Sequence, residues 1–98
     1  MDFELKDLGN SCELFLQGRL TFDGNAAFRT IIETLEKKSG RSAIVDLSGL
    51  DFIDSAGLGM LLLLQETCGR GLSLRAPKGQ VRRLLAAAHF QTIVPIAG

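Results

Sequence analysis

The sequence has neither an excess of charge of one sign nor a long apolar segment, and both absences narrow its function. Eleven basic residues balance eleven acidic ones over 98 residues, whereas nucleic-acid-binding domains usually carry a concentrated basic excess. The longest apolar run, from Leu58 to Leu64, is far shorter than the roughly 20 residues that span a bilayer. The acidic start MDFELKDLGN lacks the apolar block of a secretory signal. We therefore expect a cytoplasmic protein that binds no nucleic acid and does not insert directly into a membrane.

Residues that commonly bind metals or cofactors are also scarce. Cys12 and Cys68 are far apart and form no C-x-x-C pair, which predicts two reduced, partly buried thiols. The sequence has one histidine, His89, and no cysteine cluster, so we expect no metal site and no cofactor. It also contains no internal repeat or linker, which predicts a single domain over residues 1–98.

The spacing of apolar residues predicts an α/β fold with the element order β-β-α-β-α-β-α-β. Alternation in the segments DFELK and ELFLQ predicts two strands that form a hairpin. Helical spacing predicts three helices, at residues 24–38, 55–68 and 80–88. Short apolar runs predict further strands at residues 43–47, 72–74 and 92–94. Strands joined by helices imply parallel pairs, so we expect a mixed sheet of four to five strands with about three helices.

Some details of these elements are also predicted. Asp23 is a suitable N-cap for the first helix, and Ser39-Gly40 is a suitable end. The strand at 43–47 is short and apolar, which is typical of a central strand covered on both faces. The segment SGLDFID that follows it is expected to be a loop, and Pro95 suits a sheet edge. The helix at 55–68 is apolar nearly all round, so it should be largely buried or lie against a partner.

The segment VDLSGLDFIDSAGLGMLLLL, residues 45–64, combines a strand, polar residues and glycines with a leucine-rich helix. Either Asp54 or Ser55 could cap this helix, and one cap needs only one of them. We assign the cap to Asp54, which leaves Ser55 beside the small residues Ala56 and Gly57 and open to approach. Glycines within a helix lower its stability by up to about 1 kcal/mol each relative to alanine. They therefore indicate close packing or the close approach of another surface.

Catalysis by this segment is not supported. The nucleophile elbow G-x-S-x-G fails because Ile53 stands two residues before Ser55. The lone imidazole, His89, ends the last predicted helix, where histidine commonly interacts with the helix C-terminus. Asp51 and Asp54 are typical of turn and capping residues. We therefore expect no enzyme and no catalytic residue.

A nucleotide site is supported only weakly. The motif G-L-G at residues 57–59 would need a third glycine where Leu62 stands, and no GK[ST] follows a glycine run. Binding of a nucleotide at a helix N-terminus stays open on the sequence alone.

Three segments resemble the STAS domain, the fold of bacterial anti-sigma factor antagonists. VDLSGLDFIDSAGLGMLL is similar to the family signature, which is an apolar strand ending in Asp, an acidic loop, then D-S/T-x-G-L and a helix. LFLQGRLTFDGNAAF resembles the second strand and the start of the first helix, and GLSLRAPKGQVRRLLAAAHFQTIVPI resembles the closing part of the family. The resemblance covers nearly the whole chain in the right order.

The resemblance implies a regulator that is switched by phosphorylation. Ser55 matches the serine that a partner kinase phosphorylates, and the unphosphorylated form binds an anti-sigma factor that is often this same kinase, with a histidine-kinase-like ATPase fold. A phosphatase of the PP2C type reverses the modification. Thr21 stands where many members have an acidic residue, and Asp23 comes two positions later. The expected partner-binding residues are Thr21, Asp23, Asp51, Asp54, Ser55, Ala56, Gly57 and Leu58.

A second hypothesis is a STAS-like accessory subunit of a membrane transporter complex for lipids or anions. The leucine-rich helix would then hold the transport ATPase, and Ser55 would be structural. Neighbouring genes for a kinase or a PP2C-type phosphatase would favour the first hypothesis, and transporter genes the second.

Overall fold

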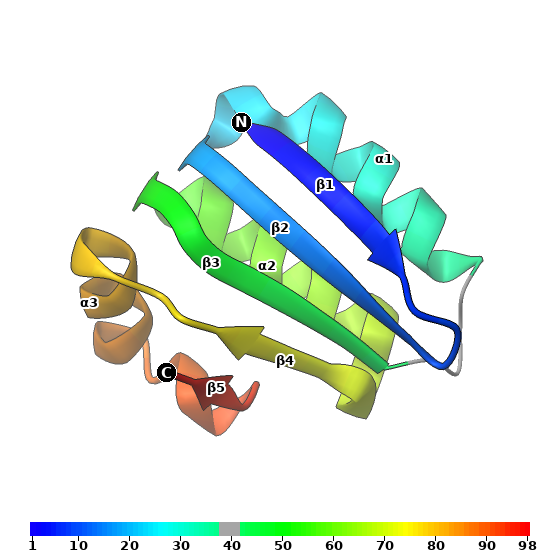
Figure 1. Cartoon of the computed structure of the whole chain (residues 1–98). Coiled ribbons are helices and arrows are strands. Elements are labelled where there is room, and N and C mark those ends of the chain that lie inside the picture. The colour runs from blue at the N-terminus through cyan, green and yellow to red at the C-terminus, as the bar shows by residue number, and fades with distance from the viewer. Residues whose placement is uncertain (38–41) are drawn as a thin grey trace.

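The strands of the computed structural model form one mixed sheet, in which their spatial order follows the chain (Figure 1). β1 pairs antiparallel with β2, and the remaining neighbours are parallel. The structure describes residues 1–37 and 42–98, so the predicted helix end at Ser39-Gly40 lies outside the described residues. The strands are β1 (Asp2–Asp7), β2 (Ser11–Leu20), β3 (Ser42–Ile53), β4 (Leu72–Arg75) and β5 (Ile96–Ala97). The predicted mixed sheet and order of elements are confirmed.

In the described ranges, three α-helices connect these strands, and short 3-10 turns precede or follow them. The helices are α1 (Asn25–Glu36), α2 (Ser55–Cys68) and α3 (Gly79–Ala87), and the 3-10 turns are η1 (Phe22–Gly24), η2 (Gly69–Gly71) and η3 (Phe90–Thr92). α1 and α2 lie side by side against the same face of the sheet, and α3 packs near the C-terminal end of β3 (Figure 1). No helix in the described part of the chain has both the length and the hydrophobicity to cross a bilayer.

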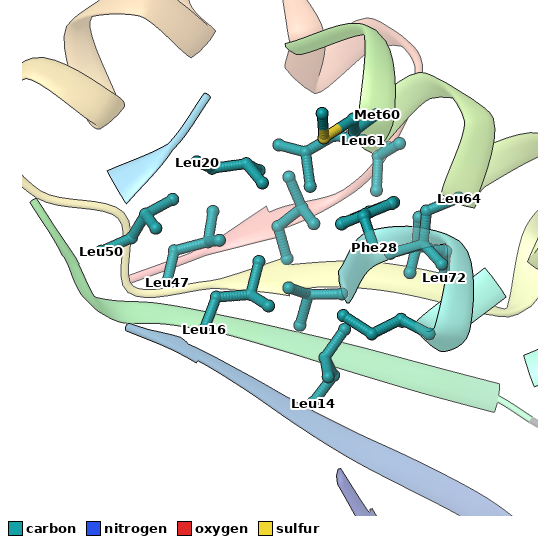
Figure 2. Close-up of a cluster of buried hydrophobic side chains, with 14 of the residues drawn as sticks. Leu14, Leu16, Leu20, Phe28, Leu47, Leu50, Met60, Leu61, Leu64 and Leu72 are labelled. Atoms are coloured by element: carbon teal, nitrogen blue, oxygen red, sulfur yellow. The ribbon is translucent and has the colours of Figure 1, made fainter. Parts of the chain in front are cut away.

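The core lies between the sheet and the pair α1 and α2. Every second residue at the start of β2 is buried, and helical spacing buries one face of α1. Figure 2 shows leucines of the strands meeting Phe28 of α1 and the inner side of α2. The residues labelled there are Leu14, Leu16, Leu20, Phe28, Leu47, Leu50, Met60, Leu61, Leu64 and Leu72. Full burial of one such side chain stabilises the fold by roughly 1.5–3 kcal/mol, so this layer fixes α2 on the sheet.

The opposite face of the sheet is partly exposed and carries charged side chains, which shows that the expectation of a β3 covered on both faces is wrong. Asp46 of β3 lies on this face and accepts a hydrogen bond from Nε of Arg75 at 2.9 Å, while Arg75 also bonds Glu13 at 2.7 Å. Partial burial would raise the pKa of Asp46, but hydrogen bonds from Ser48 and Arg75 outweigh burial and hold this pKa below its ordinary value. Because α1 and α2 cover the same face, β3 alternates inward and outward side chains as a half-covered strand does.

β3 is longer than predicted, because most of the segment SGLDFID continues the strand instead of forming a loop. β2 accompanies it to the pair Leu20 and Ile53, with register shifts at two places along β2. Gly18, beside one of these shifts, has a φ of 89°, a backbone conformation that glycine adopts at little cost. The long strand carries the chain straight to Asp54, so the start of α2 lies at the end of a paired strand.

Two further details of the prediction are wrong. Asp23 lies within η1, and Gly24 occupies the N-cap position of α1 without a side-chain cap. The closing strand is β5 and comes after Pro95, whereas residues 92–94 complete η3 and a bend. The hydroxyl of Thr92 donates to the carbonyl oxygen of His89 at 2.7 Å. This side-chain bond favours a local turn over an extended strand.

Candidate functional site

The junction between β3 and α2 is built around the cap that Asp54 provides. Asp54 has an extended backbone, and its Oδ1 accepts a hydrogen bond from the backbone N–H of Gly57 at 2.7 Å. Its carbonyl oxygen accepts the first helical bond, from the N–H of Leu58 at 2.9 Å. Asp54 therefore satisfies amide hydrogens that the first turn of a helix leaves unpaired. The prediction that Asp54 caps α2 is confirmed.

Gly57 brings the start of α2 into contact with the end of β2. A Cβ atom at this position would overlap the carbonyl oxygen of Leu20 and lie 2.8 Å from Cγ1 of Ile53. The same Leu20 oxygen accepts a bond from the N–H of Asp54 at 3.3 Å. Of the two explanations offered by the sequence, close packing within the molecule is the one that applies to Gly57. Glycine therefore allows the start of α2 to lie directly against the end of β2.

Ser55 is the first residue of α2, and its side chain is exposed. Within residues 1–37 and 42–98, no side chain or backbone group makes a hydrogen bond to its hydroxyl. The N-terminal end of a helix carries a partial positive charge, which favours a negatively charged group there. The geometry thus separates two tasks at adjacent residues, since Asp54 caps the helix and Ser55 leaves its hydroxyl accessible.

Gln80 of α3 fixes this junction from the other side, and the sequence analysis missed it. Its side-chain oxygen accepts from the N–H of Ile53 at 2.9 Å, and its side-chain nitrogen donates to the carbonyl oxygen of Ile53 at 2.8 Å. This amide makes the two bonds that a neighbouring strand would make, at a point that β4 does not reach. The sequence gives no local signal for it, because the two residues are 27 positions apart.

Exposed apolar side chains lie on α2 and on η1, which contacts α2, and they are not among the predicted site residues. Phe22 in η1 is 70% exposed, Leu62 37% and Leu63 49%, and η1 contacts α2. Ser55, Gly59 and Leu62 follow at helical spacing on the outer side of α2. The nearly uniform hydrophobicity of α2 was a signal for this surface, whereas the exposure of Phe22 depends on η1. We call Phe22, Gly59, Leu62 and Leu63 the apolar patch.

The structure also places the other predicted partner-binding residues near this end of the sheet. Thr21 and Asp23 directly follow β2, and Asp51 is exposed near the end of β3. β2 and β3 run parallel to their last pair, so these residues lie around the start of α2. Ala56 and Leu58 are half-buried, and Leu58 packs against the core. The eight predicted residues therefore come from three segments that meet at one end of the sheet.

Among the described residues, the single imidazole lies at the opposite end of α3 from the junction that holds Ser55. His89 is exposed and follows the C-terminal end of α3, whereas Gln80 near the start of α3 contacts Ile53. Gln80 and the last helical residue, Ala87, are roughly 10 Å apart along α3, and His89 lies beyond Ala87. A general base must lie within hydrogen-bond reach of its nucleophile. In the described ranges, no three His, Cys, Asp or Glu side chains gather as metal ligands would.

Comparison with known proteins agrees with this fold. A family model described as "Mlab, STAS domain" matches residues 3–95. The chain belongs to the STAS domain family. It is 33% identical over 92 residues to a STAS-domain containing protein of Pseudomonas aeruginosa, and the match covers 91% of this chain and 90% of that protein.

Solved structures of anti-sigma factor antagonists share this fold over nearly the whole chain. An anti-sigma factor antagonist from Mycobacterium paratuberculosis has a TM-score of 0.87 at 20% identity, covering 98% of this chain and 84% of its own. The anti-sigma factor antagonist SpoIIAA in its unphosphorylated form has a TM-score of 0.80 at 22% identity, covering 99% and 89%. The phosphorylated form of SpoIIAA, from Bacillus, has a TM-score of 0.73 at 20% identity, covering 99% and 92%. At these identities the similarity shows the shared fold.

Proposed function

We propose that this STAS domain is a non-enzymatic, protein-binding regulator of the anti-sigma factor antagonist type, switched by phosphorylation of Ser55. The observation that carries the proposal is the division of tasks at the helix start. Asp54 alone caps α2, and the adjacent hydroxyl of Ser55 is exposed and has no partner in the described residues. A kinase can therefore modify Ser55 without breaking an interaction that the fold needs.

The physical effect of the switch falls on binding. A phosphoserine carries about −1.5 to −2 charges, which the N-terminal end of a helix stabilises. The added charge also joins the carboxylates of Asp51 and Asp54 and adds bulk beside the apolar patch. A partner surface that fits the neutral serine then loses contact, while the domain stays folded. The partners in this scheme are an anti-sigma factor that is also a serine kinase, with a histidine-kinase-like ATPase fold, and a PP2C-type phosphatase.

The direct test is phosphorylation with candidate kinases encoded near this gene. We expect wild type incubated with kinase and ATP to gain one phosphoryl group by intact-mass analysis, and Ser55→Ala to gain none. Ser55→Asp should change the unfolding free energy by less than about 1 kcal/mol and abolish binding of the unmodified protein's partner. A mass gain in Ser55→Ala, or a large loss of stability in Ser55→Asp, would contradict the proposal.

A second candidate function is an accessory subunit of a membrane transporter for lipids or anions. The apolar patch favours it, because Phe22, Leu62 and Leu63 suit a permanently covered interface. Copurification of the natively expressed protein with an ATPase, kept in Ser55→Ala and lost in Leu62→Glu, would favour this candidate over the first.

A further inference from the structure

A shallow groove of about 410 Å³ lies between the C-terminal halves of α1 and α2. Ile32 and Glu36 line it from α1, and Leu63, Glu66 and Thr67 line it from α2. Leu63 is 49% exposed there, so its side chain faces solvent over much of its surface. The groove therefore presents one largely exposed apolar side chain, Leu63, over the buried Ile32, with a glutamate on each of the two helices.

The charges around this groove are unfavourably arranged in the free protein. Both helices end here, and the C-terminal end of a helix carries a partial negative charge that favours basic side chains. Neither helix has a basic residue in its last turn, and Glu33, Glu36 and Glu66 lie there instead. The described cations that follow these glutamates in sequence lie beyond the helix ends: Lys37 is the C-cap of α1 and borders an adjoining hollow with Glu33 and Glu36, and Arg70 lies in η2, four residues after Glu66.

These glutamates have no compensating contact in the described part of the molecule. The ion pairs of the described residues join Arg75 to Glu13 and Asp46 on the far face of the sheet. Within the same residues, the side chains of Glu33, Glu36 and Glu66 make no ion pair or hydrogen bond. Two carboxylates on facing helices raise the negative potential of the groove between them, and helix C-termini raise it further. A positively charged group seated in the groove would relieve this repulsion.

We infer that the groove binds a basic amphipathic helix of a partner protein. Its apolar side would cover Ile32 and Leu63, and its lysines or arginines would reach Glu36 and Glu66. The groove shares Leu63 with the apolar patch, so the two surfaces form one continuous interface along the outer side of α2. The inference rests on the proposed function in treating the chain as a protein-binding module, and it does not require phosphorylation of Ser55.

The occupant follows from charge complementarity. An acidic segment, or an anionic lipid surface, would bring like charge against Glu36 and Glu66 and is disfavoured. A purely apolar segment would cover Leu63, but it would also remove water from the carboxylates of Glu36 and Glu66 without giving them a positively charged partner. Removing water from an unpaired charge costs free energy. A segment that is apolar on one face and basic on the other meets both requirements, as helix-in-groove partners do.

The test uses a synthetic probe, so it needs neither the kinase nor the natural partner. A helical peptide of leucine and lysine in amphipathic order is titrated into ¹⁵N-labelled full-length protein, with a leucine and glutamate peptide as the matched probe. We expect amide shifts centred on Ile32, Leu63 and Thr67 with the basic peptide and none with the acidic peptide. The basic peptide should also bind more weakly as the salt concentration rises.

A charge-reversal pair supplies the decisive control. The double variant Glu36→Lys with Glu66→Lys should raise the dissociation constant of the basic peptide at least about tenfold. The double variant Asp2→Lys with Glu4→Lys makes the same charge change on the exposed edge strand β1 and should alter this constant less than about twofold. The neutral double variant Glu36→Gln with Glu66→Gln keeps the size of both side chains, so it tests the same charges if the reversed variant misfolds. In this variant, binding of the basic peptide should depend less on the salt concentration. Shifts centred elsewhere, or equal weakening by both reversed pairs, would overturn the inference. Neither result bears on whether Ser55 is phosphorylated.

Discussion

The inner and outer sides of the first turns of α2 differ, and two glycines show how. Gly57 lies on the inner side, where a Cβ would overlap the carbonyl oxygen of Leu20. Gly59 lies on the outer side, where a Cβ would meet nothing within 4 Å. Glycine costs a helix up to about 1 kcal/mol relative to alanine at either position. At Gly57 the close packing of α2 against β2 requires a glycine, whereas at Gly59 no described atom of the molecule comes close enough to require one.

This difference indicates that the helix start is a rigid platform with an open outer surface. On the inner side, the cap of Asp54, the oxygen of Leu20 and the amide of Gln80 hold the strand end and the helix together. On the outer side, Ser55 and Gly59 are exposed small residues on the same helix face as the exposed Leu62. A partner can therefore approach the backbone of α2 closely at a position that the core has already fixed.

Gly57→Ala should cause the largest change in stability, because it disturbs the close contact between the start of α2 and the end of β2. The added methyl group overlaps the backbone oxygen of Leu20, which cannot move as a flexible side chain can. We expect the unfolding free energy to fall by roughly 3 kcal/mol, as overpacking of a core does, measured by urea denaturation. Loss of less than about 1 kcal/mol would mean that α2 can shift away from β2 without cost.

Much of the platform was predictable from the sequence, because its signals are local. The capping pattern D-S-A-G places Asp54 before a helix, and the apolar period of α1 predicts the face that Phe28 presents to the core. The family signature around Ser55 is also a contiguous segment. The confirmed parts of the fold are those that neighbouring residues determine.

The parts that were wrong or missed depend on which segments meet in space. β3 extends to Ile53 because β2 accompanies it, although its sequence SGLDFI has the polar and glycine residues of a loop. β3 has a polar outer face because both long helices lie on the other side. The side-chain amide of Gln80 bonds both backbone groups of Ile53, which is 27 positions away in sequence. No local sequence pattern predicts such a bond.

Gln80→Ala should have the next largest effect, again on the inner side. The N–H and carbonyl groups of Ile53 lose their partners at a half-buried position, which costs roughly 1–3 kcal/mol. Urea denaturation measures this loss, and hydrogen exchange of the Ile53 amide should quicken with it. Arg83→Ala, an exposed position on the same helix, is the matched control and should stay within about 0.5 kcal/mol of wild type. Equal losses in the two variants would assign the effect to α3 in general.

Gly59→Ala should have the smallest effect on stability, and it should be stabilising. It tests whether the outer side of α2 is kept open for a partner. The new methyl group meets no atom within 4 Å, so the gain in helix propensity should raise the unfolding free energy by up to about 1 kcal/mol. The same methyl group stands between Ser55 and Leu62 on the surface proposed for the partner. The rate at which a cognate kinase phosphorylates Ser55 should therefore fall although the protein is more stable. An unchanged phosphorylation rate would show that the kinase does not need the space beside Gly59 and would remove this residue from the proposed partner surface.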